Sequence, residues 1–202
     1  MRLIAENLAC IRGGRTVFEG LSLDVAAGEG LVLRGPNGAG KTSLLRTLAG
    51  FIPPAAGRIA LDGGAEDTPV GEQAHYVGHL NGVKRALTVS ENLAFWASYL
   101  GGGAIEESLE RLNLWALRDI PAGLLSAGQG RRLGLARLHL VPRPVWFLDE
   151  PSVSLDAASQ TLLAGLIEGH VRGGGLVLAA THVPLGLELA RELVLGQGGR
   201  PA

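Results

Sequence analysis

The sequence predicts an α/β fold with a mainly parallel core sheet flanked by helices, an N-terminal antiparallel β portion and an inserted helical portion. Three observations point to it. Apolar alternation typical of strands fills the first 33 residues, helical periodicity dominates the middle, and strands alternate with helices after residue 140. Of the 202 residues, 47% are hydrophobic and 18% are charged, which suffices for a sizeable core. One compact domain over residues 1–202 is therefore expected.

Apolar periodicity and the turn residues between apolar runs place the individual elements. Strands are predicted at residues 3–9, 17–25, 31–33, 145–148, 176–180 and 193–195, with a turn at residues 12–15. Residues 57–64 predict one arm of a hairpin that is closed by Asp62 and Gly63. Helices are predicted at residues 42–49, 90–100, 105–117, 128–140 and 157–171. Arg131 and Arg132 are expected on the outer face of the fourth of these helices.

Charge and cysteine content narrow the class of protein. Eighteen basic and 19 acidic residues give a formal net charge of −1, which provides no overall field to attract nucleic acid. Cys10 is the one cysteine, so no internal disulfide can form. The longest charge-free run, residues 173–187, is shorter than the roughly 20 apolar residues that cross a bilayer. We therefore expect no nucleic-acid partner, no membrane span and, because Glu6 breaks the N-terminal apolar stretch, no signal peptide.

The most informative motif is a glycine-rich loop between a predicted strand and a predicted helix. It matches the pattern G-x-x-x-x-G-K-[ST] and consists of Gly35, Pro36, Asn37, Gly38, Ala39, Gly40, Lys41 and Thr42, with Ser43 next in the helix. Glycines let successive N–H groups curl around one phosphate, and the helix N-terminus adds positive potential. Lys41 is expected to reach the β- and γ-phosphates of a nucleotide, and the Thr42 hydroxyl to bind Mg²⁺.

A second motif supplies the acidic residues that such a loop requires. The apolar run at residues 145–148 ends in Asp149 and Glu150, so both lie at the carboxyl end of a predicted strand. Asp149 is expected to hold Mg²⁺ through water, and Glu150 to polarise the attacking water as a general base. The two motifs together predict a site that hydrolyses a nucleoside triphosphate.

A third motif carries a resemblance to a known family. It consists of Leu125, Ser126, Ala127, Gly128 and Gln129, followed by Arg131 and Arg132. This motif resembles the signature motif of the ATP-binding cassette (ABC) transporter ATPases. By itself the motif is a helix N-cap. The resemblance implies a P-loop NTPase of the ABC type with a helical subdomain at about residues 83–138. It also implies that Ser126, Gly128 and Gln129 bind the nucleotide of a second chain, so that a homodimer sandwiches ATP and acts with integral membrane transporter subunits.

Other positions match that family or depart from it. His182 matches the switch histidine that contacts the γ-phosphate, which makes it a catalytic candidate beside Glu150, and residues 154–156 resemble the loop that communicates between the two sites. His79 stands where the family usually has a glutamine that senses Mg²⁺, so it is a metal candidate. Residues 10–12 lack the aromatic side chain that usually stacks on adenine, and Arg12 is assigned no role.

A finer resemblance indicates the transport system. Residues 37–46, 76–84 and 87–93 resemble the ATP-binding subunits of the haem exporter used in cytochrome c maturation. This implies a peripheral ATPase at the cytoplasmic face of the bacterial inner membrane. The alternatives are an exporter of another hydrophobic substrate, which shares every motif, and a non-transport ATPase of the same family. The latter class usually carries long coiled-coil inserts or two cassettes, for which this chain has no room.

Two groups of side chains have open roles. Leu93, Phe95, Trp96 and Tyr99 either line a cleft that faces the membrane partner or form the core face of a helix. His75, His139 and His170 lack any haem-attachment pattern, so direct haem binding is not expected, and these histidines are predicted at the surface or in loops.

Overall fold

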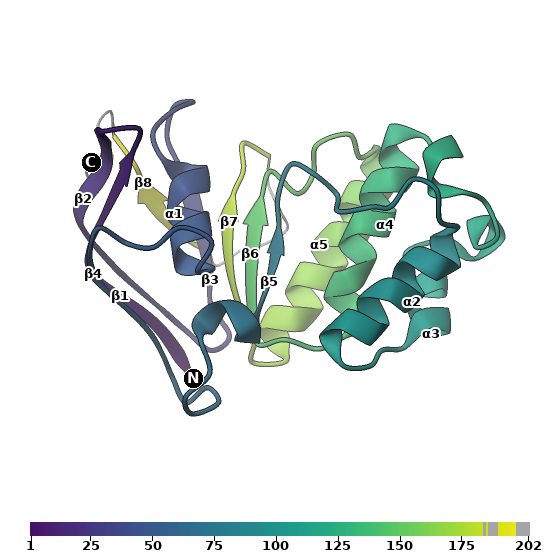
Figure 1. The fold of residues 1–202 in the computed structure, drawn as a ribbon, viewed down its shortest axis with the longest axis horizontal. Coiled ribbons are helices and arrows are strands. Elements are labelled where there is room, and N and C mark those ends of the chain that lie inside the picture. The colour runs from purple at the N-terminus through teal and green to yellow at the C-terminus, as the bar shows by residue number, and fades with distance from the viewer. Residues whose placement is uncertain (184, 186–189, 197–202) are drawn as a thin grey trace.

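The computed structural model describes residues 1–183, 185 and 190–196. A three-stranded antiparallel sheet stands at one side, a five-stranded parallel sheet lies in the middle, and a group of helices covers the other side (Figure 1). The strand orders are β2-β1-β4 and β5-β6-β7-β3-β8. This arrangement confirms the predicted α/β class with its antiparallel N-terminal portion.

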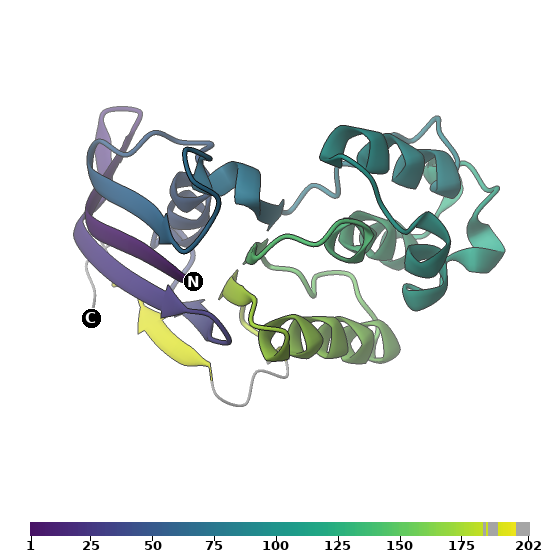
Figure 2. The ribbon, with the colours of Figure 1, turned by 90° about the horizontal axis from the view of Figure 1, so that it is seen from below.

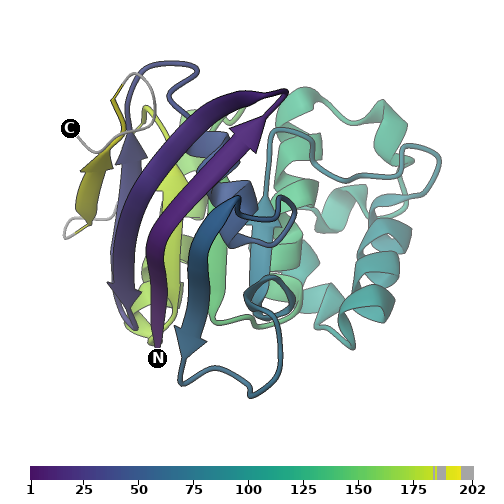
Figure 3. The same cartoon turned by 60° about the vertical axis from the view of Figure 1, so that its left-hand side comes forward.

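The antiparallel sheet comprises β1 (Arg2–Arg12), β2 (Arg15–Ala26) and β4 (Ala56–Asp62). The strands β1 and β2 form a hairpin, and β4 pairs with the opposite edge of β1, so the three lie side by side (Figure 3). The predicted hairpin around Asp62 and Gly63 is therefore wrong. The strand exists, but its partner is the distant β1, because β1 offers an unpaired edge with a complementary register.

The parallel sheet comprises β3 (Gly30–Arg34), β5 (Ala74–Val77), β6 (Val145–Asp149), β7 (Leu176–Ala180) and β8 (Arg191–Val194). Sequence reasoning missed β5, because its four residues include the polar-tipped His75 and Tyr76 and show no apolar run. The strand nevertheless pairs along its whole length with β6.

The strands β3, β6 and β7 are buried on both faces, which explains their unbroken apolar runs. Val145 and Phe147 of β6 face a core shared with the antiparallel sheet and α1 (Lys41–Leu48). Trp146 and Leu148 face a second core beneath the remaining helices. Helix α1 thus lies between the two sheets (Figure 1).

The other helices are α2 (Val89–Leu100), α3 (Ile105–Arg111), α4 (Ala127–Leu140) and α5 (Ala157–Arg172). Short 3₁₀ turns are η1 (Val70–Gln73), η2 (Trp115–Leu117) and η3 (Ala122–Leu124). The predicted helix at 105–117 is wrong in its second half, because Asn113 adopts a left-handed φ of 52° that ends the helix.

Helices α2, α3 and α4 pack on one another and form what we call the helical group. In Figure 2 the teal ribbon of α2 and α3 lies at the far end from the antiparallel sheet. Among the described residues, no helix has the length and apolar character needed to cross a membrane.

Candidate functional site

The glycine-rich loop joins β3 to α1 and depends on glycine at two crowded positions. Gly35 has a φ of 135° and Gly40 a φ of 98°, values that side chains rarely adopt. A Cβ on Gly35 would lie 2.3 Å from the Leu195 carbonyl oxygen, and one on Gly40 would lie 2.9 Å from Cγ1 of Val17. The loop can therefore approach a ligand closely only because these positions carry no side chain.

Helix α1 begins at this loop without a side-chain cap. Its N-cap is Gly40, and its first turn contains no acidic residue. A cavity of about 360 Å³ opens here, lined by Arg12, Val17, Asn37, Gly38, Ala39, Gly40, Lys41, Thr42, Ser43, Asp149 and Glu150. An uncapped helix N-terminus attracts anions through its N–H groups and its dipole. The cavity is thus built to hold a phosphate group.

Lys41 lies at the base of this cavity and is 8% exposed. Its Nζ donates to the carbonyl oxygens of Gly35 at 2.5 Å and Pro36 at 3.1 Å. Among the described residues, no carboxylate lies within ion-pair distance of it. Its hydrogen bonds in the described part of the chain go to loop carbonyls, which leaves its positive charge available to a phosphate anion.

Oxygen ligands meet at the end of the cavity where β6 finishes. Thr42 Oγ1 donates to Asp149 Oδ1 at 3.1 Å, and the Tyr76 hydroxyl lies 3.3 Å from Asp149 Oδ2. Arg46 Nε donates to the same hydroxyl at 3.2 Å. Burial raises the pKa of Tyr76, so the phenol remains protonated. Hydroxyl and carboxylate oxygens are the ligands that Mg²⁺ prefers, so Thr42 and Asp149 fit this ion.

Glu150 follows Asp149 in a strained backbone conformation. Its φ is 48°, a value uncommon for residues other than glycine, and its N–H donates to the Ala180 carbonyl at 2.8 Å. Glu150 borders the cavity around Lys41, and its Oε1 lies 3.5 Å from Nε2 of His182. The structure thus brings the two catalytic candidates together.

The signature motif forms the start of α4 and lies outside this cavity. Ser126 Oγ accepts from the Gln129 N–H at 3.2 Å, and Gln129 Oε1 accepts from the Ser126 N–H at 2.8 Å, which completes a capping box. A Cβ on Gly128 would lie 3.1 Å from the Ser154 carbonyl oxygen, so the motif adjoins the 154–156 loop. None of its residues lines the cavity around Lys41.

Arg131, two residues beyond the motif, contradicts the prediction that it lies on an outer face. It is 3% exposed and donates to the carbonyl oxygens of Gly78 at 2.8 Å, Glu150 at 2.8 Å and Pro151 at 3.0 Å. Burial lowers its pKa. Arg132 is half-buried as well, so neither arginine is a solvated surface charge. Arg131 ties α4 to the backbone of the catalytic strand end.

Two further candidates fall in different places. His79 is exposed on the loop after β5 and is not among the residues that line the cavity. The side chain from this part of the chain that contacts Asp149 is Tyr76, which sequence reasoning missed. The signal for it was a polar-tipped side chain near the end of a short strand. Arg12, to which no role was assigned, does line the cavity.

The remaining histidines are more buried than predicted. His75 lies on β5, its Nε2 is 2.7 Å from the Val141 carbonyl oxygen, and burial lowers its pKa to about 4. His170 is half-buried and stacks on Trp146 with ring centroids 3.9 Å apart. His139 lies within α4 and is also half-buried. Among the described residues, no cluster of His, Cys, Asp and Glu side chains could hold a metal ion.

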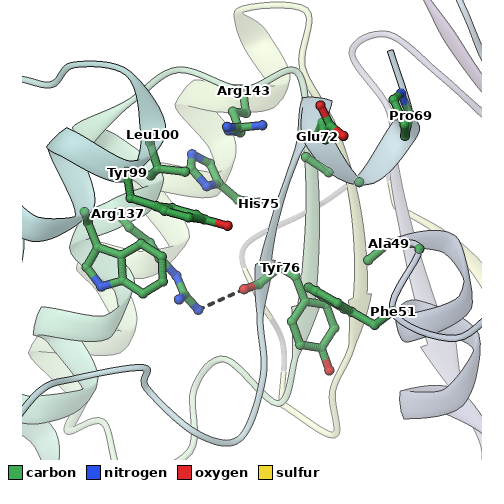
Figure 4. A pocket seen from close by; sticks show the side chains of 14 residues that line it. Ala49, Phe51, Pro69, Glu72, His75, Tyr76, Tyr99, Leu100, Arg137 and Arg143 are labelled. Atoms are coloured by element: carbon green, nitrogen blue, oxygen red, sulfur yellow. Dashed lines mark hydrogen bonds between the residues drawn. The ribbon is translucent and has the colours of Figure 1, made fainter. Parts of the chain in front are cut away.

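A separate cleft of about 490 Å³ lies where β5 meets the helical group (Figure 4). Its walls include Phe51, Tyr76, Trp96, Tyr99 and Arg137. Arg137 reaches across from α4 and donates to the Tyr76 carbonyl at 2.8 Å, the bond drawn dashed in Figure 4. The cleft therefore joins the helical group to the parallel sheet.

The sequence left open whether the largely aromatic stretch at residues 93–99 of α2 lines a cleft or forms the core face of a helix. In the structure, different residues of the stretch do each. Trp96 and Tyr99 line the cleft, whereas Leu93 is fully buried in the core of the helical group. Phe95 is partly exposed and stacks parallel to Tyr99 with ring centroids 6.4 Å apart. The stretch thus serves both the cleft and the helix core.

Comparison with known proteins identifies relatives of this chain and solved structures with the same fold. Residues 18–153 match the ABC transporter family. The chain is 52% identical over 198 residues to the cytochrome c biogenesis ATP-binding export protein CcmA of Rhodopseudomonas palustris (strain BisB5), covering 97% of this chain and 98% of the relative. An ATP-binding subunit of an ABC transporter superposes with a TM-score of 0.86 at 24% identity, covering 98% of this chain and 87% of that one. A dimeric ATP-binding cassette bound to ADP and phosphate superposes with a TM-score of 0.84 at 20% identity, covering 99% and 97%, and shares the fold.

Proposed function

The chain belongs to the ABC transporter family, and we propose that it is the ATP-hydrolysing subunit of the export system for cytochrome c biogenesis, with haem as the cargo. The identity of 52% to a protein of that system, over nearly the full length of both chains, supports this role. An exporter of a different hydrophobic substrate would use the same nucleotide site, and a non-transport ATPase would lack the membrane partner.

The main support for ATPase activity is one cavity at the N-terminus of α1. It is lined by Lys41, Thr42, Asp149 and Glu150. We propose that Lys41 leaves its loop carbonyls and binds the β- and γ-phosphates when ATP enters. Mg²⁺, held by Thr42 and Asp149, would neutralise charge on the phosphate oxygens. Residues 35–43 then supply the remaining phosphate contacts.

Glu150 is positioned to accept the proton of the attacking water. Its backbone is fixed from two sides, by the carbonyl of Ala180 and by the guanidinium of Arg131, so its carboxylate has a defined direction. His182 lies with its Nε2 3.5 Å from that carboxylate and is proposed to contact the γ-phosphate. A general base held in this way contributes a factor of about 10² to 10⁴ to the rate.

The nucleotide site is proposed to be completed by a second copy of the chain. Ser126, Gly128 and Gln129 belong to a helix N-terminus that could bind phosphate, yet they lie outside the cavity of their own chain. A homodimer that sandwiches ATP places this helix start against the nucleotide of the partner. A dimeric cassette bound to ADP and phosphate shares the fold, which supports the formation of a dimer.

The cleft at β5 is the proposed docking site of the integral membrane subunits. It exposes aromatic rings beside the buried cation Arg137, and it adjoins the strand that contacts Asp149. The chain itself is proposed to lie peripherally at the cytoplasmic face of the inner membrane. Nucleic acid and direct haem contact have no part in this proposal.

Replacement of Glu150 tests the chemical step. We expect Glu150→Gln to lower the hydrolysis rate at least about 100-fold, because the amide cannot accept the proton of water. ATP binding should persist, and ATP-dependent dimers should accumulate in light scattering. Glu168→Gln is the matched control, since Glu168 is an exposed residue of α5. Hydrolysis at the wild-type rate by Glu150→Gln would refute the assigned mechanism.

The transport system is tested by affinity capture of the tagged full chain from detergent-solubilised native membranes. Mass spectrometry should identify the membrane subunits of the cytochrome c maturation system. Recovery of a different permease would keep the ATPase mechanism and reject haem export. Recovery of no membrane protein would favour a non-transport ATPase.

A further inference from the structure

We propose that Tyr76 is a positioning residue that orients the Asp149 carboxylate for Mg²⁺ and links this carboxylate to the cleft at β5. The proposal rests on the proposed function, because it takes Asp149 as the carboxylate that supports the metal. It concerns a residue of β5 for which the sequence predicts no role of its own.

The contacts of the hydroxyl fix the carboxylate plane. Asp149 Oδ2 lies 3.3 Å from the Tyr76 hydroxyl, and Oδ1 lies 3.1 Å from Thr42 Oγ1. Each carboxylate oxygen therefore has its own hydroxyl partner, one from β5 and one from α1. Asp149 is 6% exposed, so water competes little with these two contacts. The two hydroxyls thus contact the carboxylate from two sides.

The direction of the hydrogen bonds follows from the chemistry of Arg46. A guanidinium has donors and no acceptor, so its Nε, 3.2 Å away, must donate to the Tyr76 oxygen. The single proton of the phenol is then free to point at Asp149 Oδ2, which can only accept. Arg46, Tyr76 and Asp149 thus form an ordered chain of donors and acceptors. Removing the phenol oxygen would break the chain at its centre.

The ring of Tyr76 forms a wall of the cleft. It meets Phe51 edge to face with centroids 5.2 Å apart and an interplanar angle of 76°. The two rings stand next to each other at the cleft wall in Figure 4. Phe51 is 66% exposed, so an occupant of the cleft can reach it directly. An occupant of the cleft that displaces these two rings therefore also displaces the Tyr76 hydroxyl, which orients Asp149.

The alternative link through His79 has no support in the geometry. His79 is exposed and is absent from the described lining of both the cleft and the nucleotide cavity. Tyr76, by contrast, borders the cleft and hydrogen-bonds to Asp149 at the nucleotide cavity. The residue that couples partner docking to the metal site is therefore Tyr76.

The test compares Tyr76→Phe with the wild-type full chain in binding of a fluorescent ATP analogue, titrated with Mg²⁺ and measured separately in EDTA. Loss of such a supporting contact typically costs 10- to 100-fold in metal affinity, so the Mg²⁺ concentration at half-saturation should rise about tenfold. Affinity in EDTA should stay within about twofold, since the phosphate contacts of Lys41 are untouched. Thr161→Val is the matched control, because it also removes one hydroxyl, from an exposed residue of α5 that lines neither the cavity nor the cleft.

A second variant tests the link to the cleft. Phe51→Leu removes the edge-to-face ring from an exposed position, so folding is not at risk, and the Mg²⁺ half-saturation should rise about two- to threefold. An unchanged Mg²⁺ response in Tyr76→Phe overturns the positioning role, and an unchanged response in Phe51→Leu overturns the link to the cleft. If the wild-type chain itself showed no Mg²⁺ dependence, the proposed metal site would fail instead.

Discussion

Helices α1 and α4 both start at a glycine-containing motif suited to phosphate, but only one of the two helix N-termini is capped by side chains. The start of α1 has Gly40 as N-cap and no side-chain cap, whereas the start of α4 has the complete capping box of Ser126 and Gln129. The first turn of α1 is therefore open to a ligand in the single chain. The first turn of α4 has side-chain partners for the Ser126 and Gln129 N–H groups within its own chain, which suits a motif that meets its nucleotide only when a second chain arrives.

The two helix starts are also positioned differently. Helix α1 follows β3 through the glycine-rich loop, so its place is set by chain continuity. Helix α4 belongs to the helical group and is tied to the catalytic strand end by Arg131, whose guanidinium binds the carbonyls of Gly78, Glu150 and Pro151. The direction of the signature helix is thus coupled to the backbone of Glu150.

The largest expected effect comes from removing the cation at the open helix start. Lys41→Met should lower ATP hydrolysis at least about 100-fold, because the phosphate charge loses its stabilising ammonium in a cavity of low dielectric. Steady-state hydrolysis and nucleotide binding by the purified chain measure this. Lys84→Met is the control, since Lys84 is the other of the two lysines and lies outside the cavity. Equal losses in both variants would contradict the assigned role of Lys41.

Removing the tether of α4 should have the next largest effect. Arg131→Met leaves three carbonyl oxygens without their donor, and we expect the free energy of unfolding to fall by about 3 kcal/mol. Denaturant unfolding measures the change. Arg132→Met removes an equally long side chain whose hydrogen bonds, among the described residues, go to the carbonyls of Leu112 and Asn113, and about 1 kcal/mol is expected for it. A larger loss of unfolding free energy for Arg132→Met would show that the hydrogen bonds of Arg131 are not the main interactions that hold α4 in place.

The smallest effect is expected from removing the N-cap of α4. It distinguishes the role of Ser126 in helix capping from its proposed role in nucleotide contact. Ser126→Ala should cost about 1 kcal/mol of unfolding free energy through loss of the N-cap. Thr88→Ala should cost the same, because Thr88 forms the corresponding capping box of α2 with Glu91. Only Ser126→Ala should also weaken the ATP-dependent dimer seen in light scattering. If both variants weakened the dimer equally, the signature serine would act through helix stability alone.

The sequence predicts that the residues of the glycine-rich loop and the acidic pair lie together, because the order of strands and loops along the chain places them at one edge of the sheet. Lys41 and Thr42 follow one strand and Asp149 ends another, and parallel strands bring their carboxyl ends to one edge, so their meeting could be foreseen. Tyr76 could not be foreseen, because β5 itself was missed and its contact with Asp149 depends on the pairing of β5 with β6.

Arg131 was misplaced for a different reason. Helix α4 carries small residues on its packed side, and a Cβ on Gly134 would lie 2.8 Å from the Cβ of Asn81. Glycines that allow such close approach add no apolar signal to the pattern, so the periodicity of the helix did not reveal which face is buried. A buried guanidinium that binds only backbone and amide oxygens leaves no charged partner in the sequence to predict it.

The claim that two chains share each nucleotide site is tested most directly by mixing two inactive variants. Lys41→Met damages the phosphate-binding loop, and Ser126→Arg damages the signature helix, so neither chain alone should hydrolyse ATP or form an ATP-dependent dimer. In a mixed dimer one site carries both defects and the other carries none. We predict that mixing the two folded variants restores ATP-dependent dimers and up to about half of the wild-type rate per dimer, because one of the two sites is intact. A mixture that remains as inactive as its separate components would contradict the shared site.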